Sequence, residues 1–244
     1  MTHRLTLFLF AVGAVGVALL VRAWTGSRDA RARAGWSSAI TAVIDTTREA
    51  GWIETFEAPR SQPLTTFDPR WRPIFGNLQV NARLGAAIGD RNPEDGGDDY
   101  AYRATNVPTG SVEIVVDGWW DGRGSIGAEG AVQADPPHRL YEAALWQGKL
   151  SLFYFHGPAP NQYEALAVSP ELDVARGHYR IVLRMLRRDD AWELSATLRD
   201  PRNGYAVVGE VSATDNRLGD GAQGIGILGQ APSCYVTGIA VRAL

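Results

Sequence analysis

The sequence predicts an all-β fold, an antiparallel β-sandwich preceded by one N-terminal transmembrane helix and a short juxtamembrane helix. Residues 5–21 form one uncharged apolar run, and from residue 52 onward short apolar stretches alternate with Gly, Pro, Asn and Asp. Such stretches, without long helical periods between them, are typical of antiparallel sheets, because parallel strands need long crossover connections. We therefore divide the chain into an anchor (1–24), a linker with a helix (25–51) and one sandwich (52–244).

Composition supports one large strand-rich domain without disulfide cross-links. With 244 residues, 45% of them hydrophobic, the chain can bury a substantial core. The 27 Gly, 13 Pro and 8 Trp are typical of a fold with many turns and large aromatic anchors. Cys234 is the single cysteine and is expected to be a small buried hydrophobe. The net charge of −3 gives no basis for binding a phosphate backbone, so nucleic acid is not an expected partner.

The segment Leu5–Val21 is a run of 17 residues without a charge. As a helix it spans roughly 26 Å, close to a hydrocarbon thickness of about 30 Å if Arg4 and Arg22 extend to the headgroups. Trp24 follows where an interfacial aromatic residue belongs. The alternative is a secretory signal cleaved near Ala23, but the weakly charged start and the length of the run favour an anchor.

A short helix is predicted between the anchor and the sandwich, over residues 35–50. Trp36, Ile40 and Ile44 lie near helical spacing, and Gly51 follows as a stop signal. The polar, Arg-rich stretch before this helix suits the headgroup region of a bilayer.

Strands are predicted for the apolar stretches of the remaining chain, and the pair Gln147-Gly148 is predicted as a tight hairpin turn. In chain order the stretches are 52–56, 74–85, 100–107, 111–120, 139–157 with its central turn, 164–170, 178–186, 191–200, 206–213, 224–229 and 234–244.

Several of these stretches carry a resemblance to a known superfamily. They are ETFE at Glu54–Glu57, Trp71 followed by GNLQVNARLG at Gly76–Gly85, SVEIVVDG at Ser111–Gly118, YEAALWQGKLSLFYF at Tyr141–Phe155, GHYRIVLRML with WELSATLRD, and GAQGIGILG before the closing strand. In this order they resemble the concanavalin A-like lectin/glucanase superfamily, which includes laminin G-like domains. The resemblance implies a jelly-roll sandwich over residues 52–244.

Two indications conflict over the side of the membrane that the sandwich occupies. Arg4 is the single Lys or Arg before the anchor, whereas four arginines follow it within the next dozen residues, which by the positive-inside rule places the sandwich in the cytoplasm. The resemblance implies a domain that works outside the cytoplasm. We expect a single-pass membrane protein with a periplasmic or extracytoplasmic domain, as in a bacterial cell envelope.

No catalytic motif is recognisable, and the chain is not expected to be an enzyme. A glucanase of the resembled superfamily would carry Glu-x-Asp-x-x-Glu on one strand, and this pattern does not occur. Glu113 and Asp117 share a strand face but lie too far apart for retaining hydrolysis. The motif Gly-x-Ser-x-Gly is also missing, and the four histidines are scattered.

The acidic loop near residue 95 is a weak candidate for a Ca²⁺ site. Asp95, Asp98 and Asp99 supply oxygen ligands of the kind that Ca²⁺ prefers, and calcium often accompanies the resembled superfamily. Their spacing does not match a known calcium loop, so a solvated turn is the favoured interpretation. No other cofactor is expected.

Two adjacent tryptophans are candidates for contact with a ligand or partner. Trp119 and Trp120 lie on opposite faces of a predicted strand, so one ring packs inward while the other can be exposed beside Arg123. An exposed ring beside polar donors suits a sugar or a protein surface. The alternative is that both rings pack in the core.

Two functions follow from these features. The first is a non-catalytic, membrane-anchored accessory subunit that docks on other transmembrane subunits of a larger complex, for instance a respiratory or photosynthetic one. Ala11, Ala14 and Ala18 form a small-residue stripe that lets another helix approach, although such residues are common in any spanning helix. The alternative is a cell-envelope glycan-binding module or a glycoside hydrolase of the concanavalin A-like type.

Overall fold

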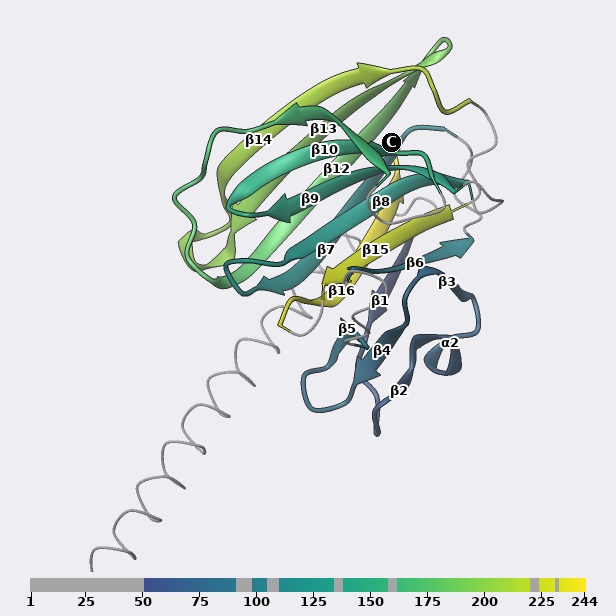
Figure 1. The fold of residues 1–244 in the computed structure, drawn as a ribbon, viewed down its shortest axis with the longest axis vertical. Coiled ribbons are helices and arrows are strands. Elements are labelled where there is room, and N and C mark those ends of the chain that lie inside the picture. The colour runs from purple at the N-terminus through teal and green to yellow at the C-terminus, as the bar shows by residue number, and fades with distance from the viewer. Residues whose placement is uncertain are drawn as a thin grey trace, which may run out of the picture. The chain divides into compact units, whose positions relative to one another are not determined.

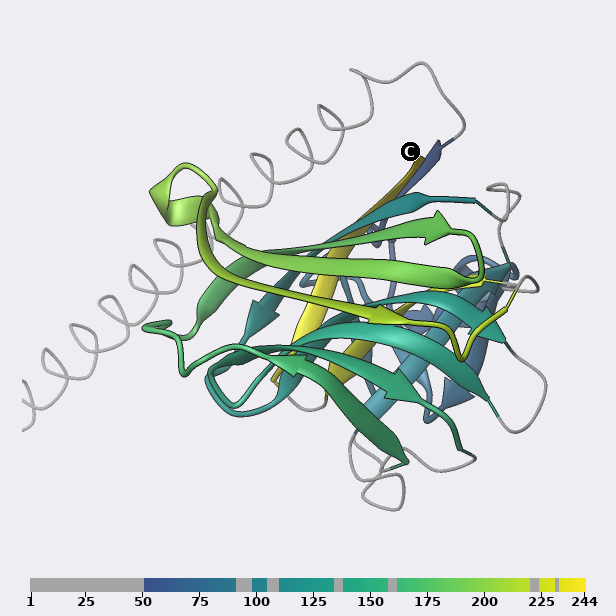
Figure 2. The same cartoon turned by 90° about the horizontal axis from the view of Figure 1, so that it is seen from above.

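The computed structural model describes residues 51–90, 98–104, 110–133, 138–157, 162–219, 224–230 and 233–244. These residues form an antiparallel sandwich of two β-sheets (Figure 1), as the sequence predicts, and the arrangement fits a jelly roll. In Figure 2 the green strands near residues 177–215 form one layer above the teal strands near residues 139–155.

The first sheet, sheet A, has nine strands in the order β14-β13-β12-β7-β16-β5-β4-β2, with β1 also paired to β16. Their bounds are β1 Gly51–Thr55, β2 Gln62–Pro63, β4 Leu78–Asn81, β5 Ala86–Gly89, β7 Val112–Trp120, β12 Gly177–Arg188, β13 Ala191–Asp200, β14 Ala206–Asp215 and β16 Tyr235–Ala243.

The second sheet, sheet B, has seven strands in the order β11-β10-β9-β8-β15-β6-β3. Their bounds are β3 Trp71–Phe75, β6 Asp98–Ala104, β8 Ser125–Gln133, β9 Arg139–Trp146, β10 Lys149–Phe155, β11 Tyr163–Val168 and β15 Gly224–Gln230. Two short helical turns, α2 Leu64–Phe67 and η2 Pro201–Asn203, complete the described elements.

The main core lies between the two sheets, because alternate residues of each strand point inward. In β7, Ile114, Val116 and Trp120 are buried in this core, and Leu183 of β12 is paired with Ile114 in the sheet. Ile126 of β8 contributes from the opposite sheet. Burial of each such side chain stabilises the fold by about 1.5–3 kcal/mol relative to exposure.

The hairpin turns follow local sequence. Gln147 and Gly148 have φ of 49° and 73° and join β9 to β10 with Trp146 directly opposite Lys149. These angles are those of a two-residue turn with both central residues at positive φ, so the predicted turn is confirmed.

One predicted stretch is divided between the sheets. Residues 74–85 are predicted as one unit, but Gly76 adopts φ of 54° and ends the extended run. Phe75 therefore belongs to β3 in sheet B, whereas the next strand, β4, lies in sheet A. The turn at Gly76 is what lets the chain cross from one sheet to the other.

The predicted membrane location is corrected. Among the residues that the structure describes, no helix is both long and apolar enough to cross a bilayer. The longest, α2, has four residues and spans about 6 Å, against a hydrocarbon core of about 30 Å. The segment Leu5–Val21, the stripe Ala11, Ala14 and Ala18, and the helix expected over residues 35–50 lie outside the described residues.

Candidate binding groove

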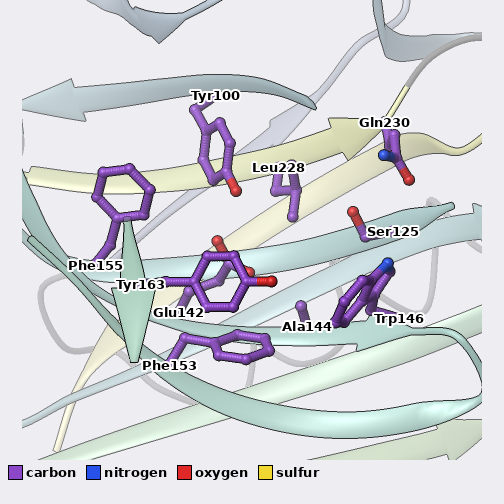
Figure 3. Close-up of a pocket in the computed structure, with 10 residues that line it drawn as sticks. All are labelled: Tyr100, Ser125, Glu142, Ala144, Trp146, Phe153, Phe155, Tyr163, Leu228 and Gln230. Carbon is purple, nitrogen blue, oxygen red and sulfur yellow. The ribbon is translucent and has the colours of Figure 1, made fainter. Parts of the chain in front are cut away.

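A groove lies on the outer face of sheet B, on the side turned away from the main core (Figure 3). The groove is open to solvent, and the space between its walls together with its open mouth is about 520 Å³. Its lining comes from β6, β8, β9, β10, β11 and β15, and consists of Tyr100, Ser125, Glu142, Ala144, Trp146, Phe153, Phe155, Tyr163, Leu228 and Gln230.

Strand alternation sends these side chains outward. In β9, Tyr141 and Ala143 belong to the main core, so Glu142 between them must point to the other face. The register of β9 with β10 places Phe153 directly opposite Glu142 and Phe155 opposite Leu140. The groove is therefore a direct product of the pairing register of neighbouring strands.

One wall of the groove is an aromatic cluster of Trp146, Phe153 and Tyr163, contributed by β9, β10 and β11. The ring of Tyr163 lies 5.0 Å from that of Phe153 and 6.5 Å from that of Trp146, both edge to face. Tyr163 is 41% exposed, although exposed large hydrophobic residues are few among the described residues. An exposed aromatic ring beside polar groups provides an apolar platform for a flat ligand face.

The opposite wall is a second aromatic cluster, built on β3, β6 and β10. The ring centroids of Tyr100 and Phe155 lie 5.9 Å apart, and Phe75 contacts both of them at 5.8 and 5.4 Å. His138 packs edge to face on Phe75 at 5.5 Å. Figure 3 shows the Glu142 carboxylate surrounded by the rings of Tyr100, Phe155, Tyr163 and Phe153.

Two carboxylates lie side by side at the floor of this face. Glu129 of β8 is the direct cross-strand partner of Glu142 in β9, and the two side chains are 0% and 5% exposed. Both carboxylate oxygens of Glu129 are buried without a hydrogen-bond partner. Burial, and then the neighbouring Glu142 carboxylate, raise the pKa of Glu129 well above 4.5.

Glycine in β15 makes room for this carboxylate. Gly226 is the β15 partner of Glu129, and a Cβ at that position would overlap the Glu129 Oε2 atom. The next outward residues of the same strand, Leu228 and Gln230, line the groove. Ser125 and Gln230 supply neutral hydrogen-bonding groups at the end of the groove near Trp146 (Figure 3).

The predicted contact residues Trp119, Trp120 and Arg123 do not belong to the groove. Trp120 points into the main core, where its Nε1 donates to the Gly124 carbonyl at 2.8 Å. Trp119 lies half-buried on the outer face of sheet A, its ring parallel to that of Tyr235 at 6.3 Å. Arg123 is exposed in the turn after β7. Adjacent tryptophans do point to opposite faces, but the outer one is on the sheet opposite the groove.

Glu113 and Asp117, the two carboxylates considered for retaining hydrolysis, are both bound to arginines. Glu113 forms ion pairs with Arg242 at 2.7 Å and Arg184 at 3.3 Å. Asp117 accepts two hydrogen bonds of 2.7 Å from Arg180. These carboxylates are paired on the outer face of sheet A, which is a structural role.

The calcium candidates are not brought together in the described part of the chain. Asp95 lies outside the described residues, and the side chain of Asp98 does too. Asp99 is buried and accepts a 2.8 Å hydrogen bond from the backbone N–H of Asn77. Within the described ranges no group of three or more His, Cys, Asp or Glu side chains could hold a metal ion.

Cys234 is buried, as the sequence predicts. Burial raises the pKa of its thiol to about 12, so the thiol stays protonated and unreactive at neutral pH. Its Sγ lies 3.2 Å from Oδ1 of Asp121, in the turn between β7 and β8.

Sequence reasoning missed Trp146, Tyr163, Glu129 and Glu142. A usable signal was present for the two glutamates, since each interrupts an otherwise apolar strand, in IGAEGAV and in LYEAAL. A charged residue inside such a strand either faces water or marks a buried functional position.

Comparison with known proteins gives structural neighbours of low identity. No protein-family model matches the sequence, and no curated protein matches it. Lectin II from Ulex europaeus is similar in structure, with a TM-score of 0.49 and 9% identity over 80% of this chain and 99% of the lectin. A galectin-like protein from Bacillus subtilis has a TM-score of 0.46 and 13% identity over 78% of this chain and 98% of its own.

A family 43 glycoside hydrolase is also similar, with a TM-score of 0.44 and 11% identity over 79% of this chain, which spans 41% of the hydrolase. Likeness at such low identity concerns the fold alone. The structures similar to this chain include lectins and a glycoside hydrolase, while its architecture as an antiparallel sandwich follows from its own strand pairing.

Proposed function

We propose that the protein binds a carbohydrate in the groove on the outer face of sheet B. The observation that carries the proposal is the combination of Tyr163 and Trp146, partly exposed rings, with the polar groups of Glu142, Ser125 and Gln230 in one concave site. Sugars present apolar C–H faces and a rim of hydroxyl groups, and such a site offers partners for both.

The placement of the site supports this proposal. The floor is rigid because its residues lie on paired strands rather than on loops, which keeps the polar groups in fixed positions. The exposed edge of the site is β11, where Tyr163 lies.

Hydrolysis of a glycan is a second candidate, favoured by the Glu129–Glu142 pair. Directly opposed residues of antiparallel strands have Cβ atoms about 4.5–5.5 Å apart, comparable to the carboxyl separation of about 5–5.5 Å in retaining glycosidases. The raised pKa of Glu129 suits a general acid. Binding is preferred as the main function because both Glu129 carboxylate oxygens are buried.

Docking on a larger complex stays a prediction. It depends on Ala11, Ala14 and Ala18, which lie outside the described residues.

Binding to a glycan array, followed by calorimetric titration of the bound sugars with the full chain, tests the proposal. We expect Trp146→Ala and Tyr163→Ala to weaken binding about tenfold or more, because each removes a ring surface from the groove. Trp119→Ala is the matched control, since this ring lies on sheet A, and it should leave the affinity unchanged.

A protein that binds no glycan, or groove variants that bind as tightly as the unaltered protein, would contradict the proposal. The same mixtures assayed for new reducing ends decide between binding and hydrolysis. Hydrolysis that stops in Glu142→Gln while binding persists would favour the second candidate.

A further inference from the structure

We propose that a second copy of this chain binds along strand β14, so that two protomers pair edge to edge. The inference is independent of the proposed function. It is carried by a difference between the edges of the two sheets, in length, in proline content and in exposed apolar side chains.

One end of the strand order in each sheet is protected against the addition of another strand. Sheet A ends at β2, which has two residues including Pro63, and sheet B ends at β3, which carries Pro73. Proline has no backbone N–H to donate, and a short strand offers few free backbone groups. These two edges therefore discourage pairing with another chain.

The opposite ends of the two sheets lack this protection. They are β14, of ten residues, and β11, of six, and neither strand contains a proline or a lysine. Arg217 links the two strands, because it pairs with Glu164 of β11 and with Asp215 of β14, both at 2.6 Å. Of the four large hydrophobic side chains that are exposed in the described ranges, three lie on these strands, namely Tyr163, Val168 and Val207. This side of the sandwich is therefore open to strand addition.

The regular part of β14 fits a second copy of itself. A bulge opposite Leu198 and Arg199 interrupts the pairing of β14 with β13, and from Gly209 to Asp215 the pairing is regular. Two copies of this stretch, antiparallel about Ser212, would pair with each other over its whole length. Such an interface uses the same surface on both protomers and closes at two copies.

The side chains that would face each other in this pairing are compatible. Val211 would lie opposite Ala213 of the second copy on the core side, where both contact the main core. On the outer side, Glu210 would lie opposite Thr214, so that no like charges face each other. The two Ser212 hydroxyl groups would meet at the centre, where one can donate a hydrogen bond to the other.

Sedimentation of the full chain at several concentrations tests the inference. We expect a reversible equilibrium between monomer and dimer with a Kd in the micromolar range, because pairing along one strand buries less surface than a permanent interface. A protein that stays monomeric up to about 100 μM, a concentration well above such a Kd, would overturn the inference. So would an assembly larger than a dimer, since an interface of this symmetry closes at two copies.

A charge at the centre of the interface tests whether β14 is the strand that pairs. In Ser212→Lys two ammonium groups would face each other, and we expect the Kd of the dimer to rise about tenfold or more. Ser212 is exposed, so the variant should fold normally. The control Thr66→Lys adds the same charge at an exposed position of α2 and should leave the Kd unchanged.

A mixture of two variants tests the register. Ser212→Lys and Ser212→Glu should each associate poorly alone but form a mixed dimer when combined, because opposite charges then face each other. An unchanged Kd in Ser212→Lys, or a mixture that associates no better than either variant alone, would overturn pairing along β14. None of these outcomes depends on whether the groove binds a glycan.

Discussion

At the scale of single residues, Glu129 is the group least explained by folding alone. It lies in the middle of a strand that otherwise has polar residues only at its two ends, and its described cross-strand neighbours on the same face are uncharged or acidic. Gly226 of β15 is beside it, Tyr102 of β6 lies one strand further, and Glu142 of β9 is on the other side. Folding therefore forces this carboxylate into a site that favours its neutral form.

Stability should fall with rising pH because of this one group. The pKa of Glu129 is raised in the folded state above 4.5, so its protonated form is favoured there. The contribution of protonated Glu129 to the free energy of unfolding is complete below the pKa that Glu129 has in the unfolded chain. It is lost as pH rises through the pKa that Glu129 has in the folded protein, at up to about 1.4 kcal/mol per pH unit. We expect Glu129→Gln to match the unaltered protein near pH 4 and to exceed its stability increasingly toward pH 8.

Thermal unfolding across this pH range measures the effect. The exposed Glu193→Gln serves as control and should follow the unaltered protein at every pH. If the stability of Glu129→Gln and of the unaltered protein changed in parallel with pH, ionisation of Glu129 would not destabilise the folded state, and the prediction would be wrong.

At the scale of elements, β8 contributes residues to both faces of sheet B, the groove and the main core. Its outward residue Glu129 borders the groove, whereas the next residue, Gly130, faces the core. A Cβ on Gly130 would overlap the Sδ atom of Met185 in β12 and would lie 3.0 Å from Cδ1 of Ile114 in β7. The glycine thus lets sheet A side chains pack closely against β8.

Adding one methyl group here should be destabilising. We expect Gly130→Ala to lower the free energy of unfolding by about 1–3 kcal/mol, as overpacked cores do. Gly219→Ala, at a position where a Cβ meets nothing within 4 Å, should change it by less than about 0.5 kcal/mol.

Urea denaturation of Gly130→Ala, Met185→Ala and the double variant completes this test. The cavity left by Met185→Ala can receive the new methyl group of Gly130→Ala. The losses in free energy of unfolding of the two single variants should therefore sum to more than the loss in the double variant. Strictly additive costs would mean that the methyl group is accommodated without contacting Met185.

At the scale of the whole molecule, an ion cluster links the two sheets. Arg103 of β6 in sheet B pairs with Glu54 of β1 in sheet A at 3.1 Å and with Asp68 at 3.6 Å. Its guanidinium lies 4.3 Å from the ring centre of Trp52. Hydrogen bonds from Arg70, together with the charge of Arg103, lower the pKa of Asp68 to about 2.

This cluster should stabilise the sandwich in neutral but not in acidic solution. The pKa of Asp68 is lowered from 3.8, so its contribution is present above that value and is lost as pH falls through about 2. We expect Asp68→Asn to cost on the order of 1 kcal/mol at pH 7, and the difference to vanish toward pH 2.

Urea titrations between pH 2 and pH 7 check this expectation. Asp190→Asn, in the exposed turn between β12 and β13, is the control and should have little effect throughout. A deficit of Asp68→Asn that persists unchanged at pH 2 would assign the effect to packing rather than to charge.

Local sequence was enough to predict the antiparallel sandwich. Alternation of apolar and polar residues is a property of each strand by itself, and it correctly indicated β7, β12 and β13 and the inward position of one of the two adjacent tryptophans. The turn at Gln147-Gly148 was equally local, because two residues define its backbone conformation. The crossing at Gly76 was not predicted, since it depends on which sheet accepts each half of the stretch.

The groove was decided by tertiary structure. Its aromatic walls come from segments as distant in sequence as Tyr100 and Leu228, and they meet only because β6, β15, β8, β9, β10 and β11 are neighbours in one sheet. Glu129 and Glu142 are adjacent because of the register of β8 with β9. A shift of one residue in either strand would send one carboxylate into the main core. The sequence alone thus determined most of the strands but not β5 or β8, which lie outside the predicted stretches, because the Gly and Ala residues of β8 give no clear alternation. The pairing between strands decided which side chains make a site.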